Sequence, residues 1–235
     1  MKKIIFTGGS GRFAKVFRNI EHKETIFFPT KKELNIESIK SIEKYIKKNK
    51  ANYFIHCAGL SRPMAVHTRD INKSIELNII ATANIVKACS NFNIKLIYFS
   101  TNYVYPGTKG QYREESPLLP VNDYALSKLG GECAVQMYKN SLILRICMTE
   151  KPFIHKKAFT DVNMNFMFHE DLAKNLLKLL DCKGILNVGG KTQSVYNFAK
   201  KTNKGVMKIL ARKSMGNHYP LKQSMNINKY LKAIK

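Results

Sequence analysis

Short apolar runs alternate with stretches of helical periodicity in this sequence, and the alternation constrains its fold more than any other feature. The apolar runs contain few polar residues, which is typical of strands buried on both faces. Between two such runs, Ile36, Ile39, Ile42 and Ile46 recur at helical spacing on one face. Alternation of this kind predicts a parallel sheet covered by helices on both faces. The predicted strands are residues 3–7, 25–28, 52–56, 94–100 and 141–146, and the predicted helices are residues 11–20, 36–49, 71–91 and 123–139.

The pattern weakens after Cys147, where the sequence predicts smaller elements. Residues 149–168 have no clear period, and we expect them to form a loop-rich part of a binding site. The expected fold class is α/β, with a Rossmann-type doubly wound parallel sheet at residues 1–147 and a small, reduced substrate lobe at residues 148–235, in one compact unit. The elements predicted in the lobe are a helix at residues 171–180, a strand at residues 184–188 and a short helix at residues 195–201.

A glycine-rich turn, Gly-Gly-Ser-Gly-Arg-Phe-Ala at residues 8–14, joins the first predicted strand to the first predicted helix. In this arrangement Gly8 allows a tight turn, Gly11 lets the backbone approach a pyrophosphate, and Ala14 permits close packing of helix on strand. The start of the helix offers free backbone N–H groups to phosphates. The turn therefore predicts a dinucleotide-binding site, and an ordinary glycine-rich turn is the alternative.

The end of the second predicted strand bears on the choice between NADPH and NADH. An acidic residue at that place binds the 2′-hydroxyl of the adenosine ribose in NAD-binding proteins. Here the strand end has no acid directly after it and is followed by Lys31 and Lys32, which either neutralise a 2′-phosphate or form a solvated helix start. The sequence favours NADPH, with Lys31 and Arg12 as candidate phosphate ligands, and NADH is the alternative.

Tyr124 and Lys128 are four residues apart at a predicted helix start, so their side chains share one face. A nearby ammonium lowers the pKa of a tyrosine from about 10. Such a phenol can exchange a proton with a carbonyl oxygen while hydride is transferred at the carbon. The fourth predicted strand leads into Ser100 and Thr101, and the carboxyl ends of parallel strands face the ligand crevice. Thr101 is therefore expected to offer a hydroxyl to the same oxygen.

Several segments together resemble the extended short-chain dehydrogenases/reductases, and within them the dTDP-4-dehydrorhamnose reductases. The resembling segments are the glycine turn at residues 7–14, His-Cys-Ala-Gly at 56–59, Ser-Thr-Asn-Tyr-Val-Tyr at 100–105 and Tyr-Ala-Leu-Ser-Lys at 124–128. The loop Gly-Thr-Lys-Gly-Gln-Tyr-Arg-Glu-Glu at residues 107–115 is similar to a loop of these reductases and is more specific than the glycine turn. The resemblance spans nearly the whole chain, strong up to Arg145 and thin beyond it.

The resemblance implies roles for individual residues. Tyr124 would be the general acid, Lys128 would lower its pKa and hold the nicotinamide ribose, and Thr101 would orient the substrate carbonyl. The cofactor-binding residues implied, besides Tyr124 and Lys128, are Gly8, Ser10, Gly11, Arg12, Phe13, Lys31, Cys57, Ala58, Gly59 and Asn78. The predicted substrate-binding residues are Ser61, Arg62, Asn102 and Tyr103.

The function implied is NADPH-dependent reduction of a 4-keto group on a nucleotide-linked deoxysugar, a reaction of polysaccharide biosynthesis. Asn102 stands where these reductases usually have Asp, and Arg145 is followed by Ile-Cys-Met-Thr-Glu-Lys-Pro where they usually have an aromatic–glycine segment. The chain is also shorter than typical members. Two alternatives are therefore open: a nucleotide-sugar epimerase or dehydratase of the same superfamily, and a non-catalytic NADP-binding regulatory subunit.

The chain is strongly basic, with 40 Lys or Arg against 16 Asp or Glu and a net charge of +24. Residues 182–235 contain no acidic residue at all. A charge of this size fits an anionic partner, but no nucleic-acid-binding motif accompanies it. We expect a small-molecule nucleotide sugar as the partner and neither nucleic acid nor membrane, while a homodimer is open.

The remaining composition bears on location and metal binding. The apolar run after the first lysines is too short for a signal peptide, so a cytoplasmic location is expected. The five cysteines are scattered without a Cys-x-x-Cys pair, which predicts neither a disulfide framework nor a zinc site. No metal is expected.

Overall fold

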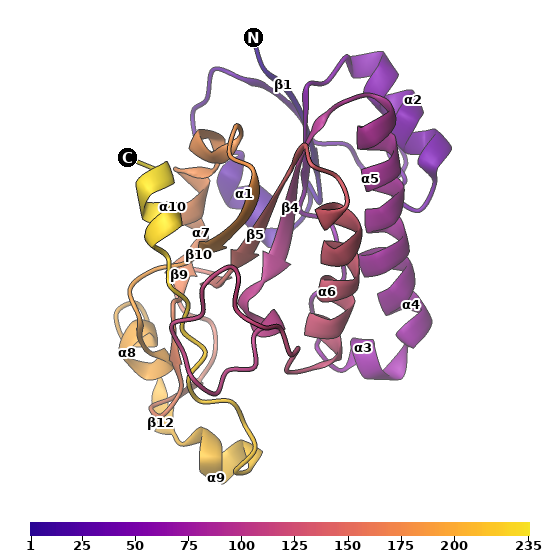
Figure 1. The fold of residues 1–235 in the computed structure, drawn as a ribbon. Helices are drawn as coiled ribbons and strands as arrows, with labels where there is room; N and C mark the ends of the chain where they lie inside the picture. Colours follow the sequence, from indigo (N-terminus) through magenta and orange to yellow (C-terminus); the bar gives the residue numbers. More distant parts are fainter.

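Six parallel strands form the central sheet in the computed structural model, which describes residues 1–235 (Figure 1). Their order is β2-β1-β3-β4-β5-β10, and every neighbouring pair is parallel. Thr7 pairs with His56 and Thr101 pairs with Ile146, so four adjacent strands end at one edge. The strand order reverses at β1, which is where ligands bind in open α/β sheets. The strands are β1 (Lys3–Thr7), β2 (Thr25–Phe27), β3 (Tyr53–His56), β4 (Lys95–Thr101), β5 (Ser141–Ile146) and β10 (Gly184–Val188).

The two faces of the sheet have separate hydrophobic cores because successive strand residues point to opposite sides. Ile4 and Phe6 lie in the core on one face, whereas Ile5 lies in the core on the other. Helices α1, α7 and α10 cover the first face, and α2, α5 and α6 cover the second (Figure 1). These helices are α1 (Arg12–Phe17), α2 (Ile39–Asn49), α5 (Ala81–Asn91), α6 (Asp123–Gln136), α7 (His169–Ala173) and α10 (Asn228–Ala233). The predicted doubly wound α/β core is confirmed.

The helix predicted at residues 71–91 is not a regular α-helix. It consists of α4 (Ile71–Ile75), a π-helical turn η1 (Glu76–Ile80) and α5, and a short helix α3 (Val66–Arg69) precedes it. π-helical turns are frequent at functional sites, and this one contains the buried Asn78. The helix predicted from residue 36 begins instead at Ile39, because the Ser38 side chain accepts a hydrogen bond from the Ser41 N–H at 3.3 Å.

A small lobe lies beyond the carboxyl ends of β4 and β5 (Figure 1). It is built from three two-stranded sheets, β6–β9, β8–β11 and β7–β12. Its core includes Phe153, Met164 and Phe198 together with Val104 and Tyr105, which precede the lobe in the sequence. The short elements are η2 (Asn102–Val104), β6 (Met148–Thr149), β7 (Lys157–Phe159), β8 (Asn163–Met164), β9 (Met167–Phe168), β11 (Gln193–Ser194), α8 (Val195–Ala199), β12 (Met207–Ile209) and α9 (Ala211–Met215).

Residues 148–235 do not all lie in the lobe as predicted, because β10 belongs to the central sheet and α7 and α10 cover one of its faces. Two further predictions for these residues differ from the structure. The helix predicted at residues 171–180 is divided into α7 and a 3-10 turn, η3 (Leu176–Leu179). The strands of two or three residues were not predicted, because so short a segment shows no periodicity. None of the helices is both long enough and apolar enough to span a bilayer.

A buried ion pair ties β5 to α6. The Arg145 Nε donates to Glu132 Oε1 at 3.1 Å, and the two side chains are 2% and 0% exposed. Glu132 also accepts from the Ser100 hydroxyl at 2.7 Å, and Arg145 donates to the Tyr105 hydroxyl at 2.7 Å. Buried charges are tolerated when they are paired and hydrogen-bonded in this way. The network therefore holds the helix that carries Tyr124 against the sheet.

Candidate active site

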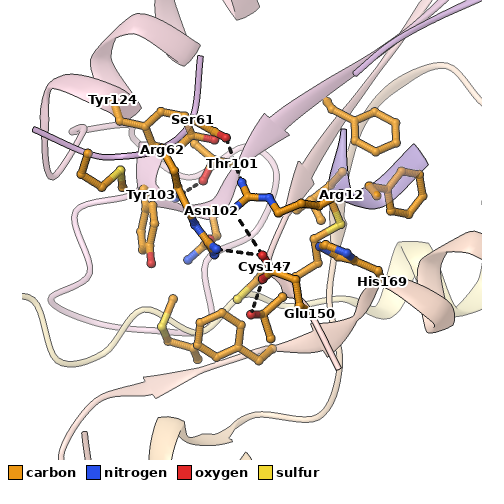
Figure 2. A pocket seen from close by; sticks show the side chains of 18 of the residues that line it. Arg12, Ser61, Arg62, Thr101, Asn102, Tyr103, Tyr124, Cys147, Glu150 and His169 are labelled. Atoms are coloured by element: carbon orange, nitrogen blue, oxygen red, sulfur yellow. Dashed lines mark hydrogen bonds and ion pairs between the residues drawn. The ribbon is translucent and has the colours of Figure 1, made fainter. Parts of the chain in front are cut away.

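A cavity of about 970 Å³ opens at the carboxyl ends of the strands, between the sheet and the small lobe (Figure 2). Most of the predicted site residues line it, although they come from separate parts of the sequence. These lining residues are Gly8, Ser10, Gly11, Arg12, Phe13, Cys57, Ala58, Gly59, Ser61, Arg62, Thr101, Asn102, Tyr103, Tyr124 and Lys128. Lys31 and Asn78 are the two predicted site residues that do not line the cavity.

The glycine turn lies against the segment that follows β3. Gly8 has a φ of +79°, and a Cβ built there would lie 2.8 Å from the Ala58 nitrogen. Gly11 closes the turn, because its N–H donates to the Gly8 carbonyl at 2.8 Å. A side chain at either glycine would meet backbone, so the turn can be this tight only with glycine. This close-packed backbone at the cavity wall fits the diphosphate of a dinucleotide.

Asn78 lies behind the cavity wall and holds two of its parts together. Its amide nitrogen donates to the Leu60 carbonyl at 2.9 Å and to the Ser127 hydroxyl at 2.8 Å. Its amide oxygen accepts from the Leu60 N–H at 2.8 Å. Asn78 thus joins the loop after β3 to helix α6. The structure gives it a positioning role in the wall, in place of the direct contact with cofactor that the resemblance implies.

Thr101, Tyr124 and Lys128 all line the cavity. Thr101 ends β4, and the other two lie one turn apart near the start of α6. The helix begins here because the Asn122 side chain accepts a hydrogen bond from the Ala125 N–H at 2.8 Å. The three side chains are therefore placed by one strand end and one capped helix, which are rigid elements.

Burial sets the protonation states of the two titratable groups. It raises the pKa of Tyr124 to about 12, and the Thr101 hydroxyl beside the phenol opposes this rise. Burial also lowers the pKa of Lys128 to about 8. The predicted lowering of the Tyr124 pKa is wrong, because desolvation of the phenolate outweighs the Thr101 hydroxyl and the charges of Arg62 and Arg12. At neutral pH the phenol carries its proton and Lys128 its charge.

Arg12 and Arg62 converge on one carboxylate that the sequence did not indicate (Figure 2). Glu150 Oε1 lies 3.2 Å from Arg12 Nη1 and 2.9 Å from Arg62 Nη1. Its other oxygen accepts from the Thr149 hydroxyl at 3.2 Å. Arg12 also donates to the Ser61 hydroxyl at 3.2 Å. The predicted cofactor ligand Arg12 and the predicted substrate ligands Ser61 and Arg62 therefore belong to one polar network.

Asn102 supplies a donor that nothing in the protein uses. Its side chain is 4% exposed and lines the cavity, yet its amide nitrogen has no hydrogen-bond partner. A buried polar group without a partner costs stability. The next residue, Tyr103, lines the same part of the cavity. Both are therefore available to contact a ligand, as their prediction as substrate-binding residues requires.

Lys31 is held away from the cavity, because its ammonium pairs with Glu37 at 2.7 Å and its side chain is 75% exposed. A different cation lies beside the glycine turn. Arg18 stacks over the Phe28 ring, with 4.1 Å between the guanidinium carbon and the ring centroid. Its Nη2 is 3.0 Å from the position of a Cβ built on Gly9. The sequence offered no signal for Arg18, since a charged residue at a helix end is usually solvated.

Other lining residues come mostly from residues 149–168, which have no clear periodicity. They follow β5 and enclose the cavity from the side of the lobe. His56, in contrast, is a satisfied core residue, with hydroxyls of Thr7 and Thr82 at 2.9 and 3.1 Å from its ring nitrogens. The lining residues that the sequence did not predict include Glu150, His155, Lys156, Lys157, His169 and Tyr219.

Part of the chain is similar in sequence to a curated protein. Methionine adenosyltransferase 2 subunit beta from Xenopus laevis is 36% identical over 114 residues, 48% of this chain and 34% of the relative. The chain thus matches about a third of the length of that relative.

Solved structures share the fold over almost the whole chain. The dTDP-4-dehydrorhamnose reductase from Bacillus anthracis, in complex with NADP, has a TM-score of 0.85 at 21% identity and is matched over 98% of this chain and 92% of its own. The Bordetella bronchiseptica enzyme WbmG, in complex with NAD, has a TM-score of 0.76 at 16% identity over 99% and 87%. At these identities the likeness shows the fold alone.

The family follows from a match within the sequence itself. The family model described as RmlD substrate binding domain matches residues 1–160, which include the glycine turn and Thr101, Tyr124 and Lys128. This match covers more than half of the chain and agrees with the resemblance to the dTDP-4-dehydrorhamnose reductases. The protein is therefore a member of the RmlD substrate binding domain family.

Proposed function

We propose that the protein is an NADPH-dependent reductase of the 4-keto group of a nucleotide-linked deoxysugar, acting in polysaccharide biosynthesis. One observation carries the proposal: Thr101, Tyr124 and Lys128 share a cavity with a glycine turn that fits a dinucleotide. Proton donor, hydroxyl and ammonium are the groups that reduction of a carbonyl requires from the protein.

The mechanism assigns a task to each of these side chains. The glycine turn and Arg12 would hold the diphosphate of NADPH, and Lys128 would hold its nicotinamide ribose. When bound, NADPH supplies the hydride for the carbonyl carbon. Tyr124, which is protonated at neutral pH, donates its proton to the carbonyl oxygen, while Thr101 orients that oxygen. The Lys128 ammonium stabilises the phenolate that forms, and the phenol then regains a proton from solvent.

The proposed substrate class is supported by the lobe side of the cavity. Arg62, Lys156 and Lys157 line the cavity and provide positive charge for the diphosphate of a nucleotide sugar. Asn102 offers its unused amide donor to an oxygen of the sugar. The family of the chain supports the same class of substrate.

NADPH is proposed over NADH because the region at the end of β2 is basic and lacks an acid for the ribose hydroxyls. Arg18 supports this choice better than Lys31, since Arg18 lies beside Gly9 of the glycine turn. Its stacking on Phe28 holds the guanidinium in place.

The test is a screen for NADPH consumption against a panel of 4-keto nucleotide sugars, with NADH measured in parallel. We expect one sugar class to be reduced, and faster with NADPH than with NADH. Absence of consumption with every sugar, in a preparation shown to bind NADPH, would contradict the reductase proposal.

A second candidate is a non-catalytic NADP-binding subunit. It is favoured by the 36% identity to methionine adenosyltransferase 2 subunit beta. In that case the protein binds NADPH without oxidising it in the sugar screen, and it co-elutes with a methionine adenosyltransferase catalytic subunit in size-exclusion chromatography. Turnover without co-elution would exclude this second candidate.

A further inference from the structure

We propose that Glu150 is an exchangeable counter-ion, which occupies the position of a ligand diphosphate between Arg12 and Arg62 and leaves it when that diphosphate binds. The proposal rests on the proposed function, in that it takes the ligand to be NADPH, whose diphosphate would lie between Arg12 and Arg62. Beyond the proposed function, it makes Glu150 a residue that sets the affinity for that ligand and the dependence of ligand binding on salt concentration.

The position of Glu150 is defined by the two arginines. One oxygen of its carboxylate is within 3.2 Å of Arg12 Nη1 and 2.9 Å of Arg62 Nη1 (Figure 2). The planar guanidinium group binds carboxylate and phosphate with the same geometry. A carboxylate at the meeting point of two such groups therefore occupies a position that a phosphate can take.

The charges around the cavity make Glu150 exceptional. The lining includes five Lys or Arg side chains, but Glu150 is its one acidic residue. Its side chain is 18% exposed, so it is more enclosed than Arg12 and Arg62, at 46% and 38%. Burial raises the pKa of Glu150, but its own backbone N–H and then the charges of Arg62 and Arg12 outweigh burial and hold the pKa below the usual value, so the carboxylate is ionised at neutral pH. The cationic lining residues are Arg12, Arg62, Lys128, Lys156 and Lys157.

The three residues come from three places around the cavity. Arg12 begins α1 at the glycine turn, Arg62 follows β3, and Glu150 follows β6 in the small lobe. The ion pairs of Glu150 thus connect the lobe to both cofactor-side loops. Glu150 occupies the Nη1 group of each arginine, so a diphosphate that takes the position between these two groups must displace the carboxylate. Binding of the ligand must therefore exchange one anion for another.

The exchange predicts a specific effect on affinity. A partly exposed ion pair contributes about 0.2–1 kcal/mol. The ligand must break two such pairs, those of Glu150 with Arg12 and Arg62, before it can bind both arginines. Glu150→Gln removes the competing charge and keeps the size of the side chain. We expect this variant to bind NADPH roughly 3- to 10-fold more tightly than the wild type at low ionic strength.

Salt distinguishes exchange from a merely structural role. In the wild type Glu150 already neutralises the arginines, whereas in Glu150→Gln they attract ions from solution, which screen them. The affinity of the variant should therefore fall more steeply with added salt than that of the wild type. Glu21→Gln is the matched control, because it removes the same charge from an exposed residue outside the cavity lining.

The experiment is calorimetric titration of NADPH into the wild type, Glu150→Gln and Glu21→Gln at low and high ionic strength, with Glu150→Ala as a second variant. Tighter, more salt-sensitive binding in both Glu150 variants, with Glu21→Gln like the wild type, supports the exchange. Unchanged or weaker binding in the Glu150 variants overturns it and leaves the proposed function intact. If the wild type itself binds no NADPH, the proposed function and this inference both fail.

Discussion

In the proposed mechanism, Lys128 is the residue that would limit activity at high pH. Burial lowers its pKa to about 8, so the ammonium is present below that pH and is lost above it. The mechanism needs this charge, and kcat/KM for NADPH reports the free enzyme. We predict that kcat/KM falls by about tenfold per pH unit above pH 8. Lys128→Arg should remove this decline, since arginine stays charged; a wild-type profile that is flat through this range would contradict the assignment.

Arg18 and Lys31 are alternative ligands for the 2′-phosphate of NADPH. Arg18 lies beside the glycine turn, whereas Lys31 is paired with Glu37 on the surface. A hydrogen bond to a charged group contributes about 1.5–3 kcal/mol. Arg18→Ala should therefore raise KM for NADPH by about tenfold or more and leave KM for NADH unchanged, while Lys31→Ala has a smaller effect. Steady-state kinetics with both cofactors measure this, and a larger loss in Lys31→Ala would restore Lys31 as the phosphate ligand.

At the scale of elements, the contact between β5 and α6 depends on the buried pair of Arg145 and Glu132. Glu132→Gln leaves the Arg145 charge buried without a counter-charge, which costs about 3–5 kcal/mol. The matched control is Glu37→Gln, because the Lys31–Glu37 pair is largely exposed and contributes at most about 1 kcal/mol. Urea unfolding measures both free energies of unfolding. Equal losses in the two variants would contradict this account of the network.

The elements that the sequence predicted best are those with a long apolar run. The strands at residues 3–7, 141–146 and 184–188 have the predicted bounds, because each has consecutive apolar residues that are buried in the sheet. The bounds of the strands in the small lobe could not be predicted from the sequence. Its strands of two or three residues are held by contacts with distant segments, so they leave no local pattern.

The site residues also divide into those that a local sequence pattern predicts and those that only contacts between distant segments define. Tyr124, Lys128 and the glycine turn are local motifs, and the sequence reached them directly. Glu150 and Arg18 have no motif, because their surroundings exist only after residues far apart in the chain come together. The rise of the Tyr124 pKa has a related cause, because the spacing of Tyr124 and Lys128 is visible in the sequence but the burial of the phenol is not.

At the scale of the whole molecule, the net charge of +24 exceeds what the cavity needs. Five cationic side chains line the cavity, and the acid-free residues 182–235 lie mostly outside it. A field of this sign attracts anionic ligands and is screened by salt. We predict that the association rate of NADPH, measured by stopped-flow fluorescence, falls steeply as salt is added. A flat response would mean that the charge has no part in ligand capture.

The central claim is that Tyr124 donates the proton to a substrate carbonyl. The most direct measurement compares turnover of a 4-keto nucleotide sugar and binding of NADPH in the wild type, Tyr124→Phe and the control Tyr196→Phe, whose tyrosine lies outside the cavity lining. Loss of a general acid lowers kcat by about 100-fold or more. We predict such a loss in Tyr124→Phe with NADPH binding retained, and none in Tyr196→Phe. Full turnover in Tyr124→Phe would contradict the account.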